Sequence, residues 1–195
     1  MIENMHAFVG DISKLELPVL NPYLEKAQTL YNENMNAYIS AILRRSFGKA
    51  MVSGNTGYFD FFDGVHRQLE TMTPMEVTSS PAYNKSALKR AVKDISSQKE
   101  LKKALEALAK RIEKHYSLAD DPDLNDSSVG QGSHHGGADV LIGTVWTACE
   151  LILCDSVKKW QAAMASVYAD AAASGVGLEY GPAEVDALFK KLKPV

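Results

Sequence analysis

Apolar side chains recur every three or four residues along most of this chain, which is the spacing of an amphipathic α-helix. The first such stripe consists of Ile2, Met5, Val9, Ile12 and Leu15. Leu17-Pro18 then ends the predicted helix, because the residue before a proline disfavours helical backbone angles. No capping residue precedes Ile2, so we expect the chain to begin inside a helix that was cut from a longer protein.

The same spacing predicts six further helices. A long helix runs from about Pro22, a good first-turn residue, to Phe47, and Gly48 is a plausible stop. Asn84 is a good N-cap, and Ser97 with Glu100 has the spacing of a capping box. The remaining ranges are approximately 59–69, 84–95, 97–116, 141–167 and 182–192. No stretch alternates with the period of two that a strand requires, so we predict an all-α fold of antiparallel packed helices.

Two segments lack this periodicity. Ser53–Gly57 has the composition of a turn, and residues 118–138 are rich in aspartate, glycine and serine but almost free of apolar side chains. We therefore expect residues 1–57 to be the end of an upstream helical bundle. Residues 58–195 would form a C-terminal helical bundle with a flexible loop at about 118–138.

Composition adds little to this picture. Of the 195 residues, 46% are hydrophobic and 23% charged, as in ordinary soluble proteins, and a net charge of −3 does not suggest a nucleic-acid partner. No apolar run approaches the roughly 20 residues needed to cross a bilayer, and no signal peptide is recognisable. We expect Cys149 and Cys154 to be buried, reduced thiols of an intracellular protein.

Candidate chemistry is sparse. His134 and His135 are adjacent in the predicted loop, where two side chains rarely reach one ion, so a solvated loop is the better interpretation than a metal site. The glycines of Gly54–Gly57 and Gly130–Gly132 lack the strand and the spacing of phosphate-binding loops. Neither cysteine has a histidine near it in sequence. We therefore predict no catalytic residues, no metal and no cofactor, and no enzymatic activity.

One region has a strong charge asymmetry. Between residues 85 and 114, ten basic residues face only four acidic ones. The candidate binding residues are Lys85, Lys89, Arg90, Lys93, Lys102, Lys103, Lys110 and Arg111. Clustered lysines of this kind bind anionic membranes or acidic partners. A solvated helix surface, partly neutralised by pairs such as Glu106 and Lys110, explains the same pattern without a function.

Several short motifs resemble those of one family. Phe61–Val65 is similar to the Phe-Phe-Glu-Gly-Val motif of the exocyst component one family. Tyr83-Asn84-Lys85, followed by Leu88 and Val92, resembles a second stretch of that family. The resemblance extends to Lys102-Lys103, Leu105, Leu108, Lys110–His115 and Val145-Trp146, and upstream to Ile2–His6 and Asn34–Tyr38.

The resemblance implies a rod of stacked helical bundles that helps to tether secretory vesicles to the plasma membrane. It implies a cytoplasmic protein, peripheral at sites of secretion, whose partners are other exocyst subunits and in addition small GTPases or SNARE regulators. The family's lipid-binding PH domain and coiled-coil region would lie before this segment. No catalytic residues follow from the resemblance. Residues 51–58 and 118–137 look longer than in animal members.

Overall fold

The computed structural model describes residues 2–47, 57–116 and 135–194 of the chain. Over these ranges the regular elements are all helices, which confirms the predicted all-α class. The predicted turn at 53–57 and the predicted loop at 118–138 fall largely outside the described residues. The predicted helix ranges are close to the observed ones, because each rests on a local apolar period.

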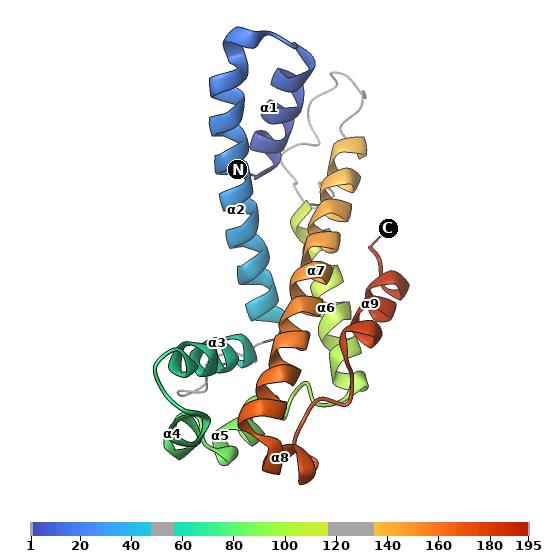
Figure 1. The fold of residues 1–195 in the computed structure, drawn as a ribbon. Helices are drawn as coiled ribbons and strands as arrows, with labels where there is room; N and C mark the ends of the chain where they lie inside the picture. Colours follow the sequence, from blue (N-terminus) through green and yellow to red (C-terminus); the bar gives the residue numbers. More distant parts are fainter. Residues whose placement is uncertain (1, 48–56, 117–134, 195) are drawn as a thin grey trace.

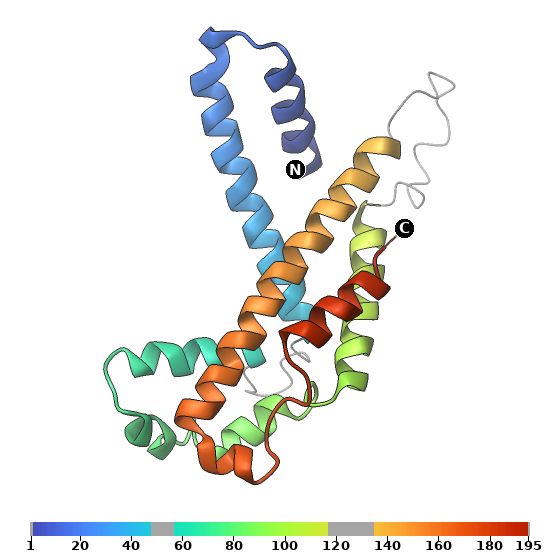
Figure 2. The ribbon, with the colours of Figure 1, turned by 45° about the vertical axis from the view of Figure 1, so that its right-hand side comes forward.

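Four helices form the body of the molecule: α2 (Asn21–Phe47), α6 (Gln98–Tyr116), α7 (His135–Val167) and α9 (Pro182–Lys191). α2 and α7 run in one direction, and α6 and α9 run in the other, so the predicted antiparallel packing is confirmed (Figures 1 and 2). α7 contacts all three of the others and lies at the centre. Its Val145, Cys149 and Val157 are fully buried.

Four short helices close one end of this body: α3 (Tyr58–Leu69), α4 (Pro74–Ser79), α5 (Lys85–Val92) and α8 (Ala169–Ala173). α4 was not predicted from the periodicity, because six residues are too few to show one. It had a recognisable start, however. Thr73 and Glu76 form a complete capping box around Pro74, in which each side chain bonds the backbone N–H of the other residue.

The opposite end is a two-helix hairpin, visible at the top of Figure 1. α1 (Ile2–Lys14) turns through a short 3-10 helix, η1 (Pro18–Leu20), and packs along the first half of α2. The second half of α2, from Tyr31 to Phe47, shares one continuous core with the rest of the chain. The division of the chain at residue 57 stays a prediction.

α7 differs from expectation in two respects. It begins at His135, six residues before the predicted start, because a helix that is already nucleated gains one hydrogen bond for each residue added. Over Asp139–Val167 it is also long and apolar enough to cross a membrane, so the expectation that no such stretch exists was wrong. Its apolar side chains pack against α2, α6 and α9, as those of the central helix of a bundle do.

Candidate interaction surfaces

The Phe61–Val65 motif forms the joint between α3 and the central helix. Phe61, Phe62 and Val65 are buried, and the Phe62 ring stacks on Trp160 of α7 with the ring centroids 5.6 Å apart. Phe61 meets Phe62 edge to face and also contacts the ring of Tyr83. These aromatic contacts explain why the motif needs two consecutive phenylalanines.

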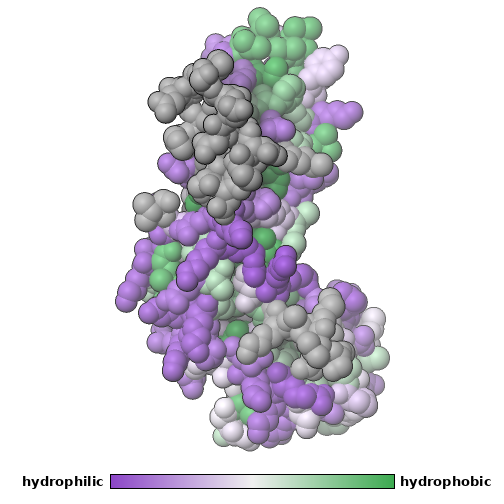
Figure 3. All heavy atoms as spheres, turned by 180° about the vertical axis from the view of Figure 1, so that it is seen from behind, coloured by the Kyte–Doolittle hydropathy of each residue, from purple (hydrophilic) through white to green (hydrophobic). Residues whose placement is uncertain are grey.

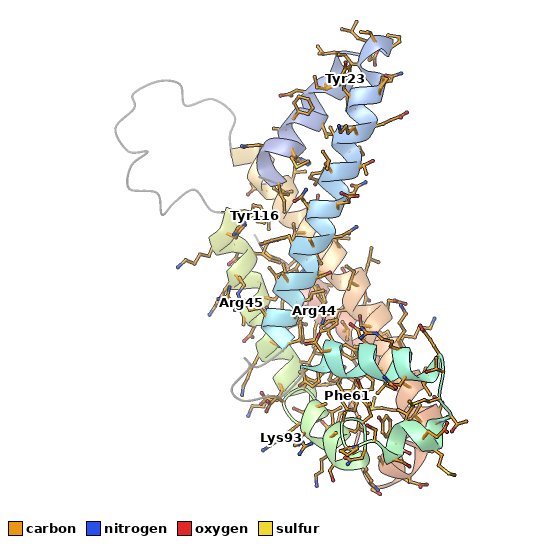
Figure 4. All side chains as sticks on the ribbon, turned by 90° about the vertical axis from the view of Figure 1, so that its left-hand side faces the viewer. Tyr23, Arg44, Arg45, Phe61, Lys93 and Tyr116 are labelled. Carbon is orange, nitrogen blue, oxygen red and sulfur yellow. The ribbon has the colours of Figure 1, made fainter. Side chains whose placement is uncertain are left out.

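Of the other two residues of the motif, Asp63 is exposed and Gly64 is buried. Asp63 and Asp60 each accept a hydrogen bond from the guanidinium of Arg44, which thereby ties α2 to α3. Gly64 lies against the ring of Tyr83, so close that a Cβ at this position would overlap the Tyr83 hydroxyl. In Figure 4, Arg44 lies at the end of α2, and Phe61 lies among the short helices at the end of the molecule opposite the hairpin.

Burial shifts the pKa of three side chains on α7 that could do chemistry. Burial raises the pKa of the Cys149 thiol to about 12 and raises the pKa of Cys154 as well, so both remain protonated at neutral pH. Burial and the neighbouring Asp186 raise the pKa of Glu150. Among the described residues no three metal-ligating side chains come together. His134 lies outside the described residues, and of His135 only the backbone, at the start of α7, is described.

Two of the predicted basic residues serve the fold. Arg111 is half-buried and donates to the Ser46 hydroxyl (2.7 Å), which joins α6 to the end of α2. Lys85 donates to the Ser174 hydroxyl (3.1 Å) and to the Asp170 carbonyl (3.4 Å), beside α8. Both cations therefore also make contacts within the fold, and their part in a binding face stays a prediction.

The remaining six predicted residues are exposed. Lys102 and Lys103 form ion pairs along α6 with Glu106 and Glu100. No ion pair occurs within the described part of the chain for Lys89, Arg90 and Lys93 on and after α5, or for Lys110 on α6. The structure thus separates the predicted set into structural, paired and unpaired cations.

α6 nevertheless presents a stripe of basic side chains, which Glu106 interrupts between Lys103 and Lys110. With 3.6 residues per turn, its outward face carries Lys99, Lys103, Lys110 and Lys114, all exposed. Arg45 of α2 lies beside α6 and next to Ser46, so it extends the same surface (Figure 4). Figure 3 shows hydrophilic side chains over the face on which α6 lies. The basic pair Arg44-Arg45 is visible in the sequence, but its place beside α6 depends on tertiary packing.

Several large apolar side chains are exposed at the tip of the hairpin. This hairpin patch consists of Leu15, Leu17, Val19 and Tyr23, which are between 50% and 73% exposed. It forms the green region at the top of Figure 3, and Tyr23 is labelled in Figure 4. The patch covers the turn between the end of α1 and the start of α2. The rest of α2 packs on other helices.

A groove of about 530 Å³ lies between α3 and α4. It is lined by Gln68, Met72, Met75, Glu76, Ser79, Ser80 and Tyr83. Met75 is 79% exposed and Met72 45%, so two flexible apolar side chains stand at its edge. The groove could not be predicted from the sequence, because α4 is too short to show a period.

Comparison with known proteins agrees with the resemblance. A family model described as the C-terminal part of the exocyst complex component Sec3 matches residues 1–170. Proteins named exocyst complex component 1 from Drosophila melanogaster and Mus musculus are 28% and 29% identical over 117 and 116 residues. The aligned segments cover 60% and 59% of this chain, but only 12% of each relative. No solved structure matches.

Proposed function

Because the chain belongs to the Sec3 C-terminal family of exocyst components, we propose that it is a non-enzymatic scaffold segment of the exocyst. In this role it would help to tether secretory vesicles to the plasma membrane, in the cytoplasm at sites of secretion, through contacts with other exocyst subunits. Small GTPases and SNARE regulators are further proposed partners. The chain spans 12% of the length of its curated relatives, so most of such a subunit lies outside this segment.

The observation that carries this proposal is the hairpin patch. Large apolar side chains that cluster on a protein surface usually mark a site of contact with another protein. Here Leu17, Val19 and Tyr23 project from the tip of a helical hairpin, away from the shared core. A helical layer of the same subunit or of a neighbouring subunit would remove them from water, as stacked bundles do. This is the role we propose for residues 1–57.

The test is co-purification of exocyst subunits from a cell extract. We expect the chain to recover them, and the triple variant Leu17→Ser, Val19→Ser, Tyr23→Ser to recover several-fold less. Leu151→Ser is the matched control, because Leu151 is 67% exposed on α7, outside the hairpin patch. Failure of the unaltered chain to recover any exocyst subunit would contradict the proposal, as would equal recovery by the triple variant.

A second candidate function is binding to anionic membranes, which the basic stripe favours. Each lysine near an anionic leaflet contributes about 1 kcal/mol, so the four lysines of the stripe with Arg45 would suffice for reversible binding. The unpaired Lys89, Arg90 and Lys93 would add to it only if the membrane reaches α5. Glu100, Glu106 and Glu113 on α6 weaken the field.

Sedimentation with vesicles distinguishes this function from a solvated surface. We expect binding to phosphatidylserine vesicles but not to phosphatidylcholine vesicles, with loss on adding salt. Charge reversal of Lys99, Lys103, Lys110 and Lys114 to glutamate should abolish it, whereas Lys26→Glu on the hairpin should not. Binding that persists after charge reversal of the stripe would exclude the basic face as the membrane site.

A further inference from the structure

We propose that the groove between α3 and α4 binds a short segment of a partner protein that carries a long apolar side chain next to a lysine or arginine. The groove lies at the lower left of Figure 1, at the end of the molecule opposite the hairpin. The inference therefore concerns a second surface and goes beyond the proposed function.

The edge of the groove is apolar and adaptable. Met72 and Met75 are both exposed, Met75 more than any other large apolar side chain of the described residues, and both line this groove. Methionine is unbranched and polarizable, which is why it recurs at surfaces that accommodate varied apolar partners. Exposed methionines at the edge of a groove thus favour an apolar side chain as the anchor of the ligand.

The opposite side of the groove is fixed. The ring of Tyr83 lies on the backbone of α3 at Gly64 and contacts Phe61 at 5.8 Å between ring centroids. The hydroxyl of Tyr168 donates to the Tyr83 carbonyl (2.6 Å), which holds the backbone there. The glycine of the Phe61–Val65 motif therefore has a specific use, because it admits the ring that forms the wall of the groove.

The charge of the groove selects a basic ligand. Glu76 is the one charged residue among the seven that line it. Its Oε2 accepts from both the amide N–H and the hydroxyl of Thr73 (2.8 Å each), which holds the carboxylate in place, and these bonds lower the pKa of Glu76. Oε1 has no hydrogen bond within the described residues, so it can accept one from a lysine or arginine.

The size of the groove limits what can bind. A volume of about 530 Å³ falls within the range of sites that hold a small ligand, roughly 300 to 1,000 Å³. This is room for a few side chains and not for a packed helix of several turns. A short linear segment of a protein, with one apolar anchor and one flanking cation, fits both the volume and the charge.

The test uses the full chain with ε-methyl-labelled methionines and three synthetic octapeptides. The first peptide has two leucines flanked by lysines, the second has glutamates in place of the lysines, and the third has serines in place of the leucines. We expect the first peptide, at up to about millimolar concentration, to shift the Met72 and Met75 methyl resonances, while those of the buried Met35 and Met164 stay in place. The other two peptides should bind with at least fivefold lower affinity.

Two variants test the assignment of residues. Glu76→Gln keeps a capping-box partner for Thr73 but removes the charge. It should therefore lower the affinity for the lysine peptide and leave the fold intact. Met75→Ser removes an apolar side chain that is 79% exposed, and Leu151→Ser is the matched control elsewhere. The proposal is overturned if no peptide shifts the Met72 and Met75 resonances, if all three bind equally, or if Glu76→Gln and Met75→Ser leave the affinity unchanged. Binding here does not depend on the hairpin patch, so either proposal can fail alone.

Discussion

At the scale of single residues, Gly64 shows how a sequence motif encodes a tertiary contact. Glycine is a poor helix former, and in α3 it costs about 1 kcal/mol relative to alanine. The structure gives the compensating reason, since the Tyr83 ring occupies the space where a Cβ would stand. The motif therefore combines two core phenylalanines, a partner for Arg44 and a position without a side chain.

A double-mutant cycle tests this explanation. We expect Gly64→Ala to lower the free energy of unfolding by about 1 to 2 kcal/mol, because overpacking exceeds the gain in helix propensity. In a Tyr83→Ala background the clash is absent, so the same substitution should be neutral or stabilising by up to about 1 kcal/mol. Urea unfolding followed by circular dichroism measures all four proteins. Equal effects in both backgrounds would show that Tyr83 is not the obstacle.

The two cysteines should differ in reactivity. Cys149 is fully buried and its thiol pKa is raised to about 12, whereas Cys154 is half-buried and its Sγ lies 3.6 Å from the Pro182 carbonyl oxygen. We expect a thiol reagent at pH 8 to modify Cys154 slowly and Cys149 only upon unfolding. Spectrophotometric titration in the absence and presence of urea gives the count of reactive thiols. Rapid modification of both in the native protein would contradict the described burial.

At the scale of elements, the end of α1 is set by an unusual residue. Glu16 has a φ of +50°, in the left-handed region where glycine normally ends a helix. The Leu15 amide N–H bonds the Ile12 carbonyl (3.2 Å), so the chain tightens just before this residue. A residue with a side chain costs roughly 1 to 2 kcal/mol in this conformation. The hairpin tolerates that cost at Glu16, which lies between Leu15 and Leu17 of the hairpin patch.

Replacement of this residue should stabilise the hairpin. We expect Glu16→Gly to slow amide exchange in α1 by an amount equivalent to about 1 kcal/mol, after allowance for the greater freedom of glycine in the unfolded chain. Glu16→Ala is the matched control, because it removes the carboxylate but keeps the Cβ, and it should have little effect. Hydrogen exchange followed by NMR reports on α1 separately from the core. Equal protection in both variants would mean that the left-handed conformation carries no strain.

At the scale of the whole molecule, the parts that could be predicted from sequence are those that depend on neighbouring residues. The ranges of α5 and α6 follow from apolar periods and from caps: the Asn84 side chain accepts the Ala87 amide N–H, and the Ser97 hydroxyl accepts the Glu100 amide N–H. The sequence also indicated the all-α class, and the motif order indicated the family. The fold class and the family each depend on many residues, so one unusual residue does not change either prediction.

The surfaces were harder to predict, because they depend on which helices meet. Arg45 joins the basic stripe only because the end of α2 packs on α6, and Arg111 bonds Ser46 for the same reason. The groove needs α4 and the position of Tyr83 over Gly64, neither of which has a periodic signature. The helices and the charge excess could therefore be predicted from the sequence. The candidate sites could not, because they depend on how the helices pack together.

The shared core has a consequence for the stability of the whole chain at high pH. Burial raises the pKa of Cys149 and of Tyr168 to about 12, from ordinary values of 9.0 and 10.0, and it raises the pKa of Tyr58 and Tyr180 as well. Between about pH 9 and pH 12 the unfolded chain therefore releases protons that the folded chain retains. The folded state binds more protons in this range, so the free energy of unfolding falls as pH rises.

Each such group contributes a slope of about 1.4 kcal/mol per pH unit once its unfolded form is ionised. We expect stability to be nearly level from pH 7 to pH 8.5 and to fall steeply above pH 10, as measured by urea unfolding at a series of pH values. Cys149→Ala should be less stable at neutral pH, because it leaves a small cavity. Above pH 9, however, its free energy of unfolding should fall less steeply with pH, by about 1.4 kcal/mol per pH unit. Parallel curves for the two proteins would show that Cys149 ionises as readily in the core as in the unfolded chain. A shallower curve for Cys149→Ala would show that the folded core keeps the Cys149 thiol protonated over this range, as its complete burial on the central helix predicts.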